Sequence, residues 1–220
     1  MHHSDNVDSG LEKLNNLLPL QKRLAGATDQ ETSLYRDILY GFLDNGRAPS
    51  ISELSQASPE LDVATILEKL ADLDLIVLDK GAEVAGAYPF TNEERDHRLK
   101  VKGKDMFAMC ALDALSLAPM FGVTSEISSV CAMTGEPVTI SMDGDRVLSV
   151  SPENIHVGIR WQSTCGCAAA NLCTEMVFLA DAIIAEQWQQ QDADNISLYT
   201  LQEAVEFGDR FFSPLVWHRH

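Results

Sequence analysis

A thiol and a carboxylate stand three residues apart in the segment Cys110-Ala-Leu-Asp113, inside an apolar run from Met106 to Leu117. If this run is helical, positions i and i+3 share one face, so Asp113 can hold a proton beside the sulfur of Cys110. Asp105 is suitably placed to cap such a helix. A buried carboxylate is costly unless it is paired or used, so the pattern predicts proton chemistry at sulfur. The alternative is that Asp113 simply points to solvent at the helix surface.

The other cysteines indicate that this chemistry concerns a soft metal. Cys131 and Cys173 follow downstream, with two more thiols in Cys165-Gly-Cys167. Thiolates select soft metals, so several of them beside a carboxylate favour soft-metal chemistry over disulfides. Structural zinc is disfavoured, because no second closely spaced cysteine pair accompanies Cys165 and Cys167. Ordinary packing is the alternative interpretation of Cys110 and Cys131, since cysteine is among the most buried residue types.

The composition excludes several classes of partner. The chain has 220 residues, 45% of them hydrophobic, which is enough for one large domain or two small ones. No apolar stretch is long enough to span a membrane, and the first residues lack the pattern of a secretory signal. Together with an odd number of cysteines, this predicts a cytoplasmic protein with reduced thiols. The net charge of −17 opposes binding to nucleic acid or an anionic membrane surface.

Helical patterns dominate the first part of the chain. Leucines recur at helical spacing near the start, where Pro19 should divide the helix, and Gly46 provides a later stop signal. The expected elements are helices over 11–24, 31–45 and 50–57, a helix starting at Ser58-Pro59, and strands at 75–78 and 84–90. Helices followed by a hairpin form the order of a winged helix. We therefore expect a winged-helix-like lobe at residues 29–92, after an N-terminal helix or extension at residues 1–28.

The lobe is not expected to bind DNA. Its groove-entering helix would lie around residues 61–74, where Lys69 is the single base. The acidic side chains in that stretch are Asp62, Glu68, Asp72 and Asp74. Such a balance repels phosphates, so a structural role for the lobe is the better interpretation.

Strand patterns dominate the second half. The expected strands cover 97–101, 126–130, 138–142, 146–150 and 155–161, and the expected helices cover 180–190 and 201–212. Asp143-Gly144 should form a hairpin turn, residues 163–171 a loop, and His97 and His156 ordinary strand positions. The predicted fold class is α+β, with the winged-helix-like helical lobe packed on a mixed or antiparallel β-sheet domain at residues 93–220.

Three segments together resemble a known enzyme family. They are Phe107-Ala-Met-Cys110-Ala-Leu-Asp113-Ala-Leu, Ile127-Ser-Ser-Val-Cys131-Ala-Met-Thr-Gly-Glu-Pro-Val and Leu172-Cys173-Thr-Glu-Met-Val-Phe-Leu-Ala. In this order they resemble the organomercurial lyases, also called alkylmercury lyases, over a region from about Glu31 to the C-terminus. The resemblance implies that residues 93–220 form the catalytic domain.

The resemblance also implies a reaction, the protonolysis of a carbon–mercury bond to give a hydrocarbon and mercuric ion. It implies no organic cofactor and no catalytic metal. By motif match, Cys110 and Cys173 would bind the mercury of the substrate, Asp113 would shuttle the proton, and Cys131 would be structural. Two thiolates donate more charge to mercury than one, which makes the bound carbon more basic and easier to protonate. Side chains expected to form an apolar wall for the organic group are Phe107, Met109 and Leu112.

The pair Cys165 and Cys167 departs from the commonest family pattern. These two residues are interpreted either as accessory thiols that pass mercuric ion to small thiols or as incidental loop residues. The expected partners are an organomercurial substrate, low-molecular-weight thiols and mercuric reductase. The rival hypotheses are a metal-responsive regulator with a winged helix and a non-catalytic, thiol-rich metal-binding protein. The need for Asp113 distinguishes an enzyme from a metal-binding protein. In a non-catalytic protein, Asp113 would be dispensable and metal affinity would remain intact without it.

Overall fold

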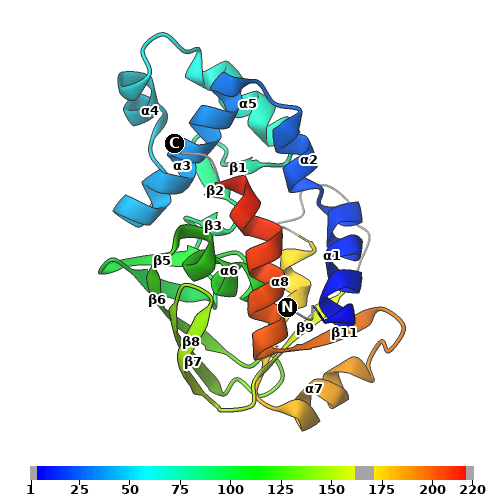
Figure 1. The fold of residues 1–220 in the computed structure, drawn as a ribbon. Helices are drawn as coiled ribbons and strands as arrows, with labels where there is room; N and C mark the ends of the chain where they lie inside the picture. Colours follow the sequence, from blue (N-terminus) through cyan, green and yellow to red (C-terminus); the bar gives the residue numbers. More distant parts are fainter. Residues whose placement is uncertain (1–3, 162–170, 217–220) are drawn as a thin grey trace.

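The computed structural model describes residues 4–161 and 171–216, which form an α+β fold with two antiparallel sheets (Figure 1). Helices α3, α4 and α5 gather at one end of the molecule, and α7 lies at the other. Helix α8 runs along the middle with α1 beside it. Residues 163–170 of the expected loop, with the thiols Cys165 and Cys167, lie outside the described residues.

The N-terminal helices follow the signals in the sequence. They are α1 (Asp5–Leu17), α2 (Leu20–Ala25), α3 (Asp29–Asn45), α4 (Ile51–Ala57) and α5 (Val63–Asp72). Pro19 separates α1 from α2, and α3 ends at Gly46 with a φ of 75°, as its stop signal predicts. Two starts were predicted wrongly. Helix α1 begins at Asp5 rather than at residue 11. Helix α5 begins at Val63 rather than at Ser58-Pro59, because the Asp62 side chain accepts the backbone N–H of Thr65 and caps it there.

An eight-stranded sheet connects the helical lobe with the second half of the chain. Its strands are β1 (Ile76–Leu78), β2 (Val84–Ala87), β3 (Phe90–Thr91), β4 (Arg98–Val101), β5 (Lys104–Ala108), β6 (Thr124–Val130), β7 (Pro137–Asp143) and β8 (Arg146–Ser151). They are ordered β1-β2-β3-β5-β4-β6-β7-β8. Phe90 of β3 pairs with Ala108 of β5, and this contact joins the hairpin of the lobe to the later strands. The sheet is therefore continuous across both regions.

A smaller sheet carries the end of the chain. It contains β9 (His156–Arg160), β10 (Met176–Leu179) and β11 (Ile196–Thr200) in the order β10-β9-β11, accompanied by α7 (Ala182–Gln189) and α8 (Leu201–Phe212). Short 3-10 turns precede β10, as η2 (Cys173–Glu175), and follow α8, as η3 (Ser213–Leu215). The sequence did not reveal β11, a five-residue strand that runs directly into the N-cap of α8 at Thr200.

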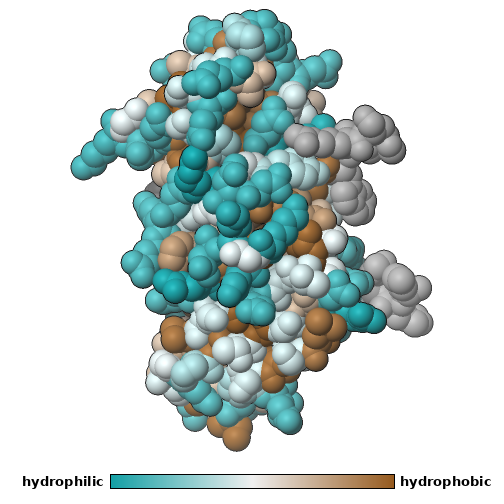
Figure 2. Space-filling view, turned by 90° about the vertical axis from the view of Figure 1, so that its left-hand side faces the viewer, coloured by the Kyte–Doolittle hydropathy of each residue, from teal (hydrophilic) through white to brown (hydrophobic). Residues whose placement is uncertain are grey.

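Helix α6 (Ala111–Phe121) lies at the centre of the core and is buried on nearly every side. Helix α8 packs closely against it, because Gly208 leaves room for the backbone of Ser116. A helix that is apolar all round has no solvent-facing side, so neighbours must cover it completely. In contrast to this apolar core, the molecular face in Figure 2 is rich in hydrophilic side chains. Within residues 4–161 and 171–216, no helix has the length and apolar character needed to cross a membrane.

Candidate active site

Cys110 is the N-cap of α6 and does not lie within the helix. Strand β5 continues through Ala108, so the predicted helix from Met106 and its cap at Asp105 are both wrong. The Sγ atom of Cys110 accepts a hydrogen bond from the backbone N–H of Asp113 over 3.3 Å. Thiol and carboxylate are therefore neighbours because of helix capping, in which position N3 faces the cap residue.

Cys173 joins this pair from a distant part of the chain. It is the first residue of η2, the turn that leads into β10, and it is 4% exposed. The ligand atoms of Cys110, Asp113 and Cys173 all lie within 4.8 Å of one another. All three are buried, and among the described residues they form the one cluster of cysteine, histidine and acidic side chains that could hold a metal ion. Two soft sulfurs and a carboxylate suit a soft cation.

Asp113 is a carboxyl group in an apolar setting. It is 1% exposed, and within the described residues its Oδ2 atom is buried without a hydrogen-bond partner. Burial raises its pKa to about 7, while the neighbouring side chains of Cys110 and Cys173 and the backbone at Cys110 oppose that rise. Near neutral pH the group can therefore exist in both forms, which is what a residue that accepts and then returns a proton requires.

The Cys110 thiol keeps its proton until something displaces it. Burial raises its pKa well above the usual range, and Cys173 and the charge of Asp113 raise it further. The S–H group points at a thioether, with Sγ of Cys110 3.6 Å from Sδ of Met176. A soft cation that binds this sulfur must therefore expel a proton, and Asp113 is the adjacent base.

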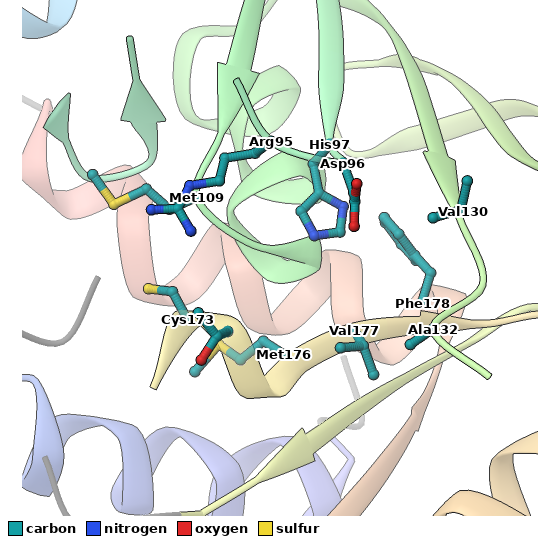
Figure 3. A pocket seen from close by; sticks show the side chains of 11 residues that line it. Arg95, Asp96, His97, Met109, Val130, Ala132, Cys173, Met176, Val177 and Phe178 are labelled. Carbon is teal, nitrogen blue, oxygen red and sulfur yellow. The ribbon is translucent and has the colours of Figure 1, made fainter. Parts of the chain in front are cut away.

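A cavity of about 180 Å³ opens beside the cluster (Figure 3). Cys173 lines it together with Met109 and Met176, and Figure 3 places Arg95 and Met109 across the cavity from Cys173. Of the three side chains expected to form an apolar wall, Met109 is a lining residue. Phe107 and Leu112 are not, because Phe107 packs against Arg98 on β4 and Leu112 is buried in α6.

Comparison with known proteins agrees with this arrangement. A family profile described as alkylmercury lyase matches residues 90–213, which span β3 to α8 and the whole cluster. The chain belongs to the alkylmercury lyase family. Among its relatives, the alkylmercury lyase of Staphylococcus epidermidis is 31% identical over 66% of this chain and 67% of its own length. The alkylmercury lyase of Bacillus cereus is 27% identical over 80% of this chain and 78% of its own.

The fold of this family member matches a solved structure. The crystal structure of the mercury-bound form of MerB2 aligns with a TM-score of 0.76 and covers 90% of this chain and 98% of that one. Sequence identity over the alignment is 20%. This likeness confirms a mixed α+β fold with antiparallel sheets.

Cys131 stands apart from the cluster. It is buried in the turn after β6, where its backbone carbonyl accepts the N–H of Gly135 and its own N–H donates to Glu136. Burial raises the pKa of its thiol, but hydrogen bonds from the Thr134 side chain and from neighbouring backbone amides outweigh that effect and lower it overall. The flanking residues Val130 and Ala132 line the cavity.

Several cavity residues were not recognised from the sequence. His97 had been expected to be an ordinary strand residue, yet it lines the cavity just before β4, with Nδ1 2.8 Å from Oγ of Ser129. Burial lowers the pKa of His97 to about 4, so the ring is neutral at ordinary pH. Met176 was also missed, although it follows Cys173 by three residues, a spacing that could have drawn attention to a second soft side chain.

Proposed function

We propose that the protein is an organomercurial lyase that protonates the carbon of a carbon–mercury bond and releases a hydrocarbon and mercuric ion. The observation that carries this proposal is the convergence of Cys110, Asp113 and Cys173 within 4.8 Å, in a chain of the alkylmercury lyase family. No cofactor takes part in the proposed reaction, and mercury enters as part of the substrate.

The first step is a ligand exchange at mercury. The sulfur of Cys110 displaces the exchangeable ligand of the organomercurial, and the carboxylate of Asp113 accepts the thiol proton. That proton leaves with the displaced ligand. Mercury favours sulfur over oxygen and nitrogen, so the exchange is downhill even from a protonated thiol. The apolar surroundings retain the neutral organomercury adduct.

The second step breaks the carbon–mercury bond. Cys173 adds its sulfur to mercury, and its proton passes to Asp113. With two thiolates donating charge, the bound carbon becomes basic enough to take the proton from Asp113. The carbon–mercury electron pair becomes the new carbon–hydrogen bond. The products are the hydrocarbon and mercury held by two cysteine sulfurs, and both thiol protons are accounted for.

Product release requires outside thiols. Two low-molecular-weight thiols exchange with Cys110 and Cys173, return a proton to each, and carry mercuric ion to mercuric reductase. Cys165 and Cys167 are proposed as accessory thiols in this transfer. We place the protein in the cytoplasm, where such thiols are reduced.

The regions of the chain are proposed to have separate roles. Residues 29–92 form a winged-helix-like lobe, supported by the order of α3, α4 and α5 before the β1–β2 hairpin. Lys69 of α5 pairs with Glu31 over 3.3 Å, which leaves the acidic side chains of this helix to repel phosphates. Residues 93–220 form the catalytic domain. Residues 1–28 are an extension, supported by an ion pair between Asp8 of α1 and Arg210 of α8.

Benzene release from a phenylmercuric salt in excess small thiol tests the activity. We expect turnover by the wild type and loss of nearly all of it in Cys110→Ser. Serine caps a helix at least as well as the residue it replaces, so this variant loses the soft ligand without losing the N-cap of α6. Cys131→Ser is the matched control, because it removes a buried thiol outside the cluster, and it should retain turnover. Equal rates in Cys110→Ser and the wild type would remove the proposed nucleophile.

A further inference from the structure

Met176 is held directly against the sulfur of Cys110. The S–H group of Cys110 donates a hydrogen bond to Sδ of Met176, with 3.6 Å between the two sulfur atoms. Met176 is 3% exposed. Strand pairing fixes the position of the methionine, because Met176 opposes Ile159 in the antiparallel β9–β10 ladder. Cys173 lies three residues earlier, in the turn η2 that leads into β10, so the thioether and the second thiol reach the site from one short segment.

The direction of this contact matters for mercury binding. Mercury takes the place of the hydrogen on the thiol sulfur, so the group that accepts the thiol's hydrogen bond faces the incoming metal. Here that group is a thioether, which is polarisable and a soft ligand like a thiolate. Met176 also lines the cavity beside Cys173, so it borders the space through which the substrate reaches the cluster (Figure 3).

We infer that Sδ of Met176 is a third, weaker sulfur ligand to the mercury atom that Cys110 and Cys173 bind. This inference rests on the proposed function. The thioether donates a lone pair to mercury, with no proton moved and no bond broken. Its added charge weakens the carbon–mercury bond before protonation and retains mercuric ion afterwards. A methionine at this position therefore tunes a reaction that the two thiols and Asp113 perform.

Selenium labelling tests the contact without any substitution. In protein whose methionines are replaced by selenomethionine, mercury L3-edge absorption should show one selenium neighbour beside two sulfur neighbours after one equivalent of phenylmercury has reacted. The selenium neighbour should disappear in labelled Met176→Leu. It should persist in labelled Met109→Leu, which removes the other cavity thioether. Absence of selenium around mercury in the labelled wild type, or its persistence in Met176→Leu, would overturn the inference.

Kinetics provide a second readout. Leucine matches methionine in volume, so Met176→Leu should stay folded while kcat for benzene release falls by roughly tenfold. Mercuric product should also exchange faster to a competing small thiol. Met142→Leu is the matched control, because it changes a buried methionine on β7, away from the cavity, and it should behave as wild type. An inactive wild type would count against the proposed function itself. An active wild type with an equally fast Met176→Leu would count against the thioether alone.

Discussion

At the scale of the residue, Cys110 has both a structural and a chemical role. It begins α6 by accepting the backbone N–H of Asp113, and its sulfur is also the proposed first ligand of mercury. Capping by itself places Asp113 beside the thiol. The burial of both groups keeps Cys110 protonated and raises the pKa of Asp113 to about 7. Near neutral pH, Cys110 therefore holds a proton while Asp113 is present in both forms, and its carboxylate form can accept that proton.

Asp113 should also make the stability of the metal-free protein depend on pH. Its folded pKa of about 7 exceeds the ordinary value of 3.8, so between these pH values the folded state holds a proton that the unfolded chain has lost. The stabilising effect is complete below the lower value and disappears as the pH rises through the upper one. The loss is on the order of 4 kcal/mol.

Asp113→Asn should remove this dependence, because the amide does not ionise. Urea unfolding at pH 5 and pH 8 measures it: the wild type should lose stability over this interval, and Asp113→Asn should lose less. Other groups that titrate here, His97 among them, contribute equally to both proteins. If the free energy of unfolding changed by the same amount between pH 5 and pH 8 in both proteins, Asp113 would not be buried in the way described.

At the scale of the element, strand β9 supports the strand that carries Met176 and follows Cys173. Gly158 of β9 pairs with Val177, and a Cβ atom placed there would clash with the Trp188 ring. The ring is rigid and nearly buried, so it cannot move aside freely. Gly158→Ala should therefore destabilise the protein by about 1–3 kcal/mol and slow benzene release by shifting β10.

A second substitution checks that cause. Trp188→Leu makes space beside position 158. The double variant should therefore lose less free energy of unfolding than the two single variants lose together. Thermal unfolding of the four proteins gives the coupling. Strict additivity would show that the alanine acts through something other than the ring.

Element by element, the sequence predicted long patterns well and junctions poorly. Pro19 and Gly46 marked helix ends correctly, since each acts through its own backbone. The segment before Cys110 was misread because an apolar run of this length is compatible with a buried strand or a helix. Pairing with β3 and β4 made it a strand.

The candidate site was predictable in part. Cys110 and Asp113 are close in sequence, so local geometry alone suggests their contact. The approach of Cys173 depends on how β10 pairs with β9, and no local pattern contains that information. The cavity residues His97 and Met176 were missed for the same reason, because they become site residues through tertiary structure.

At the scale of the whole molecule, one core extends from the N-terminal helices to the C-terminal turn. Buried residues of α1, α3, α6 and α8 belong to a single cluster, and the eight-stranded sheet crosses from the lobe into the later strands. Residues 29–92 and the later strands should therefore unfold together. We expect one thermal transition, with the same midpoint by far-UV circular dichroism and by tryptophan fluorescence. Two separated midpoints would show that the sheet does not couple the regions.

The central claim is that two sulfurs hold the mercury while Asp113 supplies the proton that frees the organic group. Native mass spectrometry after one equivalent of phenylmercury tests this most directly, because it distinguishes bound phenylmercury from bare mercury. The wild type should carry mercury without the phenyl group, and Asp113→Asn should carry phenylmercury intact. Bare mercury on Asp113→Asn, or an intact phenylmercury adduct persisting on the wild type, would contradict the account.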